Sequence, residues 1–133
     1  MNASPLHEAF GKPAQSGVQA EVIALDLSQD GAPQVLHDRL TAAGRSIDVL
    51  INNAGFGLYG RFTELDWARE HEMLQIDITA LVHMTRLFAA DMVARKSGYI
   101  LQVSSIGAFT PSPLYASYSA AKSFVLHFSE AIN

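Results

Sequence analysis

A serine, a tyrosine and a lysine in the last third of the chain have types and spacing suited to proton transfer. Ser105 follows an apolar run at residues 100–103, Tyr118 comes thirteen residues later, and Lys122 four residues after that. If residues 119–131 are helical, as their Ala, Leu and Phe content favours, Tyr118 and Lys122 share one helix face. A nearby cation stabilises a phenolate and makes a phenol a better acid–base group near neutral pH. Ser105 could hydrogen-bond the substrate oxygen that the tyrosine protonates, which predicts an oxygen-polarising site.

Three short apolar runs supply the strands that must position these side chains. They cover residues 21–25, 47–51 and 100–103, and such bounded runs are typical of buried parallel strands. A helical pattern at residues 32–43, with Pro33 suited to its first turn, lies between the first two runs. The order strand, helix, strand favours a right-handed parallel crossover. The sequence therefore predicts an α/β fold with a three-stranded parallel sheet and flanking helices.

Capping residues and apolar spacing predict where the helices begin and end. Ser28 offers a cap for the first helix and Gly44 a stop. Thr63 is a good cap for a short helix through Trp67, and a longer apolar helix is expected from about 76 to 95. These helices would cover the sheet.

The second strand runs directly into Asn52-Asn53-Ala54-Gly55, and asparagine and glycine there let the backbone turn sharply and approach a ligand. A G-x-G-x-x-G pattern runs from Gly55 to Gly60, with Asp77 about twenty residues further on, as in a dinucleotide fingerprint. We reject that interpretation because residues 61–63 separate Gly60 from the next helix, and because Asp77 lies inside a helical pattern. The glycines are expected to form a flexible loop beside a ligand.

Taken in order, Asn52-Asn53-Ala54-Gly55, Ser105 and Tyr118-x-x-x-Lys122 resemble the active-site half of the short-chain dehydrogenase/reductase family. The resemblance covers residues 21–133 and implies a partial Rossmann-like, doubly wound parallel sheet. In that family the serine orients the substrate carbonyl and the tyrosine is the general acid or base. The lysine assists the tyrosine and holds the nicotinamide ribose. By resemblance, these roles fall on Ser105, Tyr118 and Lys122.

The resemblance also implies a site for NAD or NADP. The residues after the second strand line the cofactor ribose in that family, and the aspartate after the preceding strand lies near the adenine. The implied cofactor-binding residues are Asp26, Leu27, Asn53, Ala54, Gly55, Tyr118 and Lys122.

Asp77 is a departure from the family pattern, which usually has asparagine there to hold a water in a proton relay. We include Asp77 among the catalytic candidates with Ser105, Tyr118 and Lys122. An ionised aspartate only accepts hydrogen bonds, and two roles stay open. Asp77 could hold the relay water, or pair with Lys122 and alter how that lysine acts on Tyr118. Gln102, where asparagine is common, is a lesser departure.

The implied function is that of an NAD(P)-dependent oxidoreductase that interconverts an alcohol and a carbonyl by hydride transfer, with Tyr118 as general acid or base. Its partner would be a small-molecule carbonyl or alcohol. One alternative is a catalytically inactive remnant that retains only the fold or an assembly surface. Another is a nucleotide-sugar epimerase or dehydratase, which the Asn52-Asn53-Ala54-Gly55 stretch disfavours. The resemblance also implies a homo-oligomer through the helices at 76–95 and 119–133.

Composition argues against several other classes. A net charge of -4 and a pI near 5.6 offer no basic patch for nucleic acid, and no run of 18 apolar residues could span a membrane. The chain has no cysteine, and its five histidines show no ligand spacing, so no metal site is expected. We expect a cytoplasmic protein without nucleic-acid or membrane partners.

The length of 133 residues is about half that of a typical family domain. We expect one truncated NAD(P)-binding domain in which residues 1–20 are a poorly structured remnant. The glycine-rich cofactor turn and the C-terminal strands are expected to be missing, so binding of NAD or NADP should be weak or lost. The strand at 21–25 should then close up beside the strand at 47–51, since unpaired backbone is costly.

Overall fold

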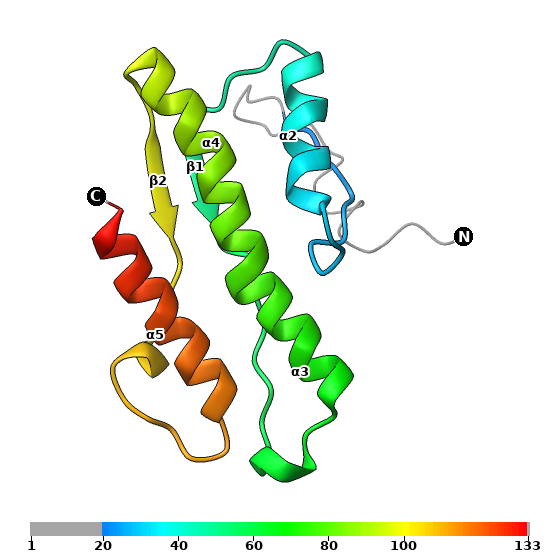
Figure 1. Ribbon diagram of the computed structural model, residues 1–133, viewed down its shortest axis with the longest axis vertical. Helices are drawn as coiled ribbons and strands as arrows, with labels where there is room; N and C mark the ends of the chain where they lie inside the picture. Colours follow the sequence, from blue (N-terminus) through cyan, green and yellow to red (C-terminus); the bar gives the residue numbers. More distant parts are fainter. Residues whose placement is uncertain (1–19, 133) are drawn as a thin grey trace.

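The computed structural model describes residues 20–132, so the prediction that residues 1–20 are a poorly structured remnant lies outside the described residues apart from Ala20. Figure 1 shows helix α4 running past the two strands, with α2 on one side and α5 on the other. In chain order the elements are α2 (Ala32–Ala42), β1 (Val49–Asn52), η1 (Phe62–Glu64), α3 (Trp67–Leu74), η2 (Gln75–Ala80), α4 (Leu81–Arg95), β2 (Tyr99–Gln102), η3 (Ile106–Ala108) and α5 (Ala116–Ala131).

The sheet within residues 20–132 consists of β1 and β2, which pair in parallel from Val49↔Tyr99 to Asn52↔Gln102. The Val103 amide extends this ladder by donating to the Asn52 carbonyl at 3.0 Å. Both strands therefore end at the same edge of the sheet, and the loops that follow them begin side by side. The predicted parallel sheet with flanking helices is confirmed for these two strands.

The first predicted strand, at residues 21–25, is not formed. The expected pairing of this segment, at Val22, with the strand that contains Val49 is therefore wrong. The segment instead meets the end of α2 through exposed ion pairs. The Glu21 carboxylate lies 2.7 Å from the Arg45 guanidinium and 3.8 Å from that of Arg39, at the end of α2. An apolar run can satisfy a strand pattern, but a strand also needs a neighbouring ladder, and residues 21–25 have none.

The hydrophobic core lies between α4 and the sheet. Leu50 of β1 and three residues of α4, Met84, Phe88 and Met92, are buried together. Burial of such side chains stabilises the fold by about 1.5–3 kcal/mol each. Partly buried apolar residues of α2 and of the strands surround them: Leu36, Leu40, Ile47, Leu87 and Ile100. The core thus fixes α2 and α4 relative to the strand ends.

The boundaries of α2 match the predicted helix, but the predicted cap does not form. Gly31, with φ of 79°, occupies the N-cap position, and Pro33 lies in the first turn as expected. Ser28 instead donates its backbone N–H and its hydroxyl to the Asp26 carboxylate, at 3.0 and 2.7 Å. Gly44, with φ of 67°, follows the helix end and confirms the predicted stop.

Asp77 lies in a π-helical segment between two α-helices that run on from each other. The chain passes from α3 into η2, a π-helical segment, and then into α4 without a break. Asp66 caps α3 by accepting from the Arg69 amide at 2.9 Å, so the predicted cap at Thr63 is wrong because that residue lies in the 3-10 turn η1. No helix opens at Gly60, as expected. π-Helical turns occur frequently at functional sites.

Helix α5 begins three residues earlier than predicted, at Ala116, which puts Tyr118 in its first turn and Lys122 one turn later. Helix α5, which carries Tyr118, thus begins close to the loops that follow the two strands.

None of the helices in residues 20–132 is long and apolar enough to cross a membrane.

Candidate active site

Tyr118 and Lys122 lie on one face of α5, as their spacing predicts. The Lys122 ammonium is 5.8 Å from the centre of the Tyr118 ring. Lys122 is only 5% exposed, whereas Tyr118 is half-buried. The lysine charge is therefore held inside the protein beside a phenol that still reaches the surface.

Lys122 is paired with Asp77, the residue that departs from the family pattern. Its ammonium lies 3.3 Å from one Asp77 carboxylate oxygen, and the Asp77 side chain is fully buried. The ammonium also donates to the carbonyl oxygen of Val103, just after β2, at 3.5 Å. Of the two roles left open by the sequence, the structure shows the ion pair.

The loop after β1 joins the same cluster. The Phe56 amide donates to the other Asp77 oxygen at 3.1 Å. A Cβ atom on Gly55 would lie 2.5 Å from that oxygen and 3.2 Å from the Lys122 nitrogen, closer than side chains can approach. Glycine at position 55 is therefore required by contact with a buried ion pair. The pair connects the loop after β1, segment η2 and α5.

Burial raises the pKa of the Asp77 carboxyl, and the Lys122 charge, with the hydrogen bond from Phe56, opposes that rise without cancelling it. The carboxyl is removed from water on all sides, which disfavours its ionised form. The folded chain therefore holds a proton on Asp77 more tightly than the unfolded chain does.

This raised pKa gives a pH-dependent prediction for Asp77→Asn. As pH rises from below the ordinary value of 3.8 through the raised value, the wild type should lose stability relative to the variant, because the folded state must release a proton it binds more tightly. Urea unfolding of both proteins at a series of pH values measures the difference. A wild type that gains on the variant as pH rises would show that attraction to Lys122 outweighs burial.

Ser105 and Tyr118 both approach Gly107, at the start of the loop after β2. A Cβ on Gly107 would lie 3.7 Å from the Ser105 hydroxyl and 3.9 Å from a Tyr118 ring carbon. The Ser105 hydroxyl accepts the Gly107 amide at 3.2 Å, which leaves its own proton available to a further acceptor. On the other side, a Cβ on Gly57 would lie 3.2 Å from a carbon of the Tyr118 ring, so the loop after β1 passes close to that ring. Two loops thus enclose the tyrosine.

The predicted cofactor residues fall into two groups. Leu27 lines a cavity of about 70 Å³ together with Asn53 and Ala54, which brings the end of the first predicted strand to the loop after β1. Asp26 is exposed, and hydrogen bonds from Ser28 hold the pKa of its carboxyl below the ordinary value. Gly55, Tyr118 and Lys122 belong to the ion-pair cluster described above.

Two polar arrangements near the site were missed by reasoning from sequence. Buried Thr85 receives hydrogen bonds from the amides of Asn52 and Gln102 at 3.0 and 2.8 Å, and so connects both strand ends to α4. Buried Glu70 of α3 accepts a hydrogen bond from Ser117, next to Tyr118. The unusual Gln102 was a signal for the first, whereas nothing local marked the second.

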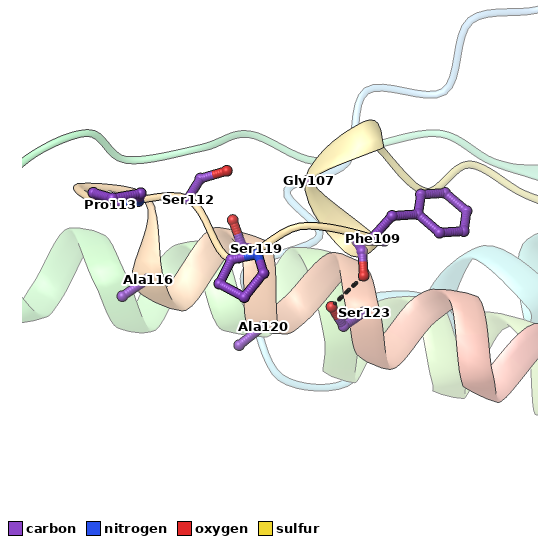
Figure 2. A pocket seen from close by; sticks show the side chains of 10 residues that line it. Gly107, Phe109, Ser112, Pro113, Ala116, Ser119, Ala120 and Ser123 are labelled. Atoms are coloured by element: carbon purple, nitrogen blue, oxygen red, sulfur yellow. Dashed lines mark hydrogen bonds between the residues drawn. The ribbon is translucent and has the colours of Figure 1, made fainter.

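A hollow lies beside the candidate site, over the first turns of α5. The loop after η3 arches over α5 and encloses a pocket of about 580 Å³ (Figure 2). The Ser123 hydroxyl donates to the Ala108 carbonyl at 2.8 Å across its floor. Tyr118 and Lys122 do not line it. We therefore do not assign the reacting group to this pocket.

The fold and these residues define a class: a parallel α/β domain whose strand ends carry a tyrosine–lysine pair. The family model for short chain dehydrogenases matches residues 1–133, so the chain belongs to the short-chain dehydrogenase family, a family of NAD(P)-dependent oxidoreductases.

Among its relatives, the chain is 36% identical over 126 residues to the very-long-chain 3-oxoacyl-CoA reductase of Anas platyrhynchos, covering 90% of this chain and 39% of that protein. It is 34% identical to the human 17-beta-hydroxysteroid dehydrogenase type 3, covering 88% of this chain and 38% of that protein. The chain thus spans about two fifths of the length of these curated relatives.

Solved structures agree on the fold. A metagenomic short-chain oxidoreductase in complex with NADP superimposes with a TM-score of 0.87 at 29% identity, over 96% of this chain and 58% of that one. The short-chain dehydrogenase from Sphingobium yanoikuyae in complex with NADPH gives 0.83 at 30% identity, over 91% and 47%. The partial Rossmann-like architecture expected from the sequence is confirmed.

The donor set suits the ribose end of a dinucleotide. An ammonium group has three N–H donors, and on Lys122 one of them is used in a hydrogen bond to the Val103 carbonyl, while Asp77 pairs with the charge at 3.3 Å. The remaining donors and the Tyr118 hydroxyl can serve ligand hydroxyl groups. The exposed backbone of Asn53 and Gly55 after β1 lies at the carboxyl end of a parallel strand, where such ligands bind.

Proposed function

We propose that this chain provides the catalytic residues of an NAD(P)-dependent oxidoreductase that interconverts an alcohol and a carbonyl. The observation that carries the proposal is the half-exposed Tyr118 beside the buried Lys122 ammonium at the carboxyl ends of β1 and β2. Membership of the short-chain dehydrogenase family supports the reaction class.

In the reducing direction, the Tyr118 hydroxyl donates its proton to the carbonyl oxygen of the substrate. The Ser105 hydroxyl donates a hydrogen bond to the same oxygen, whose negative charge grows as the carbonyl double bond opens. The Lys122 ammonium stabilises the phenolate that Tyr118 leaves behind. A bound NADH or NADPH supplies the hydride, with both bonding electrons, to the carbonyl carbon.

The cofactor would contact the residues around the small cavity at Leu27 and those of the ion-pair cluster. We propose that Asn53, Ala54 and Gly55 line the ribose through their exposed backbone, with Tyr118 and Lys122 on its other side. The cavity shared by Leu27 with Asn53 and Ala54 supports a position for the adenine end near that segment, beside Asp26.

Cofactor oxidation in the presence of carbonyl compounds tests this function against the alternative of an inactive protein. We expect the longest natural polypeptide that contains these residues to oxidise NADPH or NADH when ketones or aldehydes are added, followed by the near-ultraviolet absorbance of the cofactor. Formation of the matching alcohol should equal the cofactor consumed. If neither cofactor is consumed with any member of a broad carbonyl panel, the inactive alternative is favoured.

A further inference from the structure

The two loops that enclose Tyr118 carry exposed apolar side chains. The positions that a Cβ would take on Gly57 and Gly107 lie 3.2 and 3.9 Å from Tyr118 ring carbons, so both loops pass close to the ring. Close to Gly57, Tyr59 is 65% exposed, and beside Gly107, Ile106 is 87% exposed. The exposed large apolar residues of these loops and of the turn before α5 are Tyr59, Phe62, Ile106, Phe109, Leu114 and Tyr115. We call this set the apolar rim.

Three tyrosines form a continuous series across the rim. The ring centres of Tyr59 and Tyr115 are 5.1 Å apart, and those of Tyr115 and Tyr118 are 6.1 Å apart. Both separations are within the range for favourable aromatic contacts. The half-buried Tyr118 is thus the innermost ring, and the more exposed Tyr59 is the outermost.

The backbone holds the two outer rings in place. The Gly60 amide donates to the Leu114 carbonyl at 2.9 Å and so ties the loop after β1 to the turn before α5. Leu114 has a φ of 68°, which leucine rarely adopts. Such strained residues persist where the surrounding structure fixes them, and they cluster at functional sites.

The positive charge of Arg61, beside the apolar rim, is paired with a carboxylate. Arg61 is the charged residue between Tyr59 and Phe62, and its guanidinium lies 3.3 Å from the Glu64 carboxylate. The rim therefore offers ring faces and alkyl groups to a ligand rather than an unpaired charge. Exposed apolar groups in mutual contact, as Tyr59 and Tyr115 are, are typical of a ligand-binding surface.

We propose that Tyr59 and Tyr115 form an aromatic wall that selects ketones, or the corresponding secondary alcohols, with a bulky apolar group next to the reacting carbon. This inference rests on the proposed function, because Tyr118 fixes where the carbonyl oxygen lies. The wall continues directly from Tyr118 through ring contacts, so a flat or ring-bearing group attached to that carbonyl would lie against it. The charged group nearest in sequence to Tyr59, the Arg61 guanidinium, is already paired with Glu64, so the wall itself offers an acidic substrate only ring faces.

Steady-state kinetics with two ketones tests the wall. Acetophenone carries an aryl group beside its carbonyl, and acetone carries only methyl groups. We expect the wild type to have a kcat/KM for acetophenone at least tenfold above that for acetone. Tyr59→Ala should lower the acetophenone value about tenfold, mainly through KM, and leave the acetone value within about twofold, since one aromatic contact contributes roughly 0.5–1.5 kcal/mol beyond its buried area.

Tyr99→Ala is the matched control, because Tyr99 is also a well-exposed tyrosine (77%, against 65% for Tyr59) but lies at the opposite end of β2. This variant should leave kcat/KM unchanged for both ketones. Tyr115→Ala should repeat the Tyr59 result, and Tyr59→Ala stands alone if the other variant fails to fold. Equal losses for both ketones, no loss for either, or dissociation of an oligomer in Tyr59→Ala without a change in KM would each overturn the inference. Absence of turnover in the wild type would instead count against the proposed function.

Discussion

Tyr118→Phe should lower kcat by about 10²–10⁴-fold in the longest natural polypeptide that contains these residues, because it removes the proposed proton donor and nothing else. The phenylalanine keeps the ring against which Gly57 and Gly107 pack, at 3.2 and 3.9 Å from their Cβ positions. Folding should therefore change little. The Kd for the cofactor, measured separately, reports the loss of the hydroxyl group that we assign to the ribose. Single-turnover measurement of cofactor oxidation separates this loss from any effect on product release.

The control for this variant is Tyr99→Phe, which makes the same chemical change on a tyrosine at the amino end of β2, away from the carboxyl ends of the strands. Its rate should match the wild type. Circular dichroism and urea unfolding establish that both variants fold equally well. A Tyr118→Phe protein with a wild-type rate would falsify the assignment of Tyr118 as acid or base.

Lys122→Met should cost both stability and activity. Removing the lysine leaves the fully buried Asp77 carboxylate without its cation, and breaking a buried pair from one side costs about 3–5 kcal/mol. That is a large share of the roughly 5–15 kcal/mol that stabilises a domain. The loss should be greater at neutral than at acidic pH, because acid can neutralise Asp77. Denaturant unfolding at both pH values measures it.

A second substitution separates the two roles of Lys122. In Lys122→Met with Asp77→Asn, no unpaired charge is buried, and the asparagine oxygen can still accept the Phe56 amide. We expect most of the lost stability to return while activity stays low, since the ammonium that stabilises the phenolate is still absent. If the double variant is no more stable than Lys122→Met, the ion pair is not the source of the loss.

The sequence was sufficient for features that depend on local spacing. The apolar runs at β1 and β2, the helix pattern of α2 and the four-residue spacing of Tyr118 and Lys122 each reflect a repeat within a few residues, and each was correctly placed. The catalytic candidates followed from a motif whose parts are short and ordered. The absence of a helix at Gly60 followed from the residues after it.

Features that depend on contacts between distant segments required the tertiary structure. The run at residues 21–25 has a strand pattern, yet a strand exists only if a neighbour completes its ladder, and no strand within residues 20–132 pairs with it. Glu21 instead forms exposed ion pairs with Arg39 of α2 and with Arg45. The cap at Thr63 was misplaced because a 3-10 turn intervenes before Asp66.

Asp77 shows the same division at the site itself. The sequence established an aspartate where the family usually has asparagine, and left open whether it holds a water or pairs with Lys122. The π-helical turn and the burial of α5 against it bring the two side chains to 3.3 Å. A carboxylate removed from water takes the nearest cation. Which cation is nearest is set by how η2 and α5 pack, and no spacing in the sequence encodes that distance.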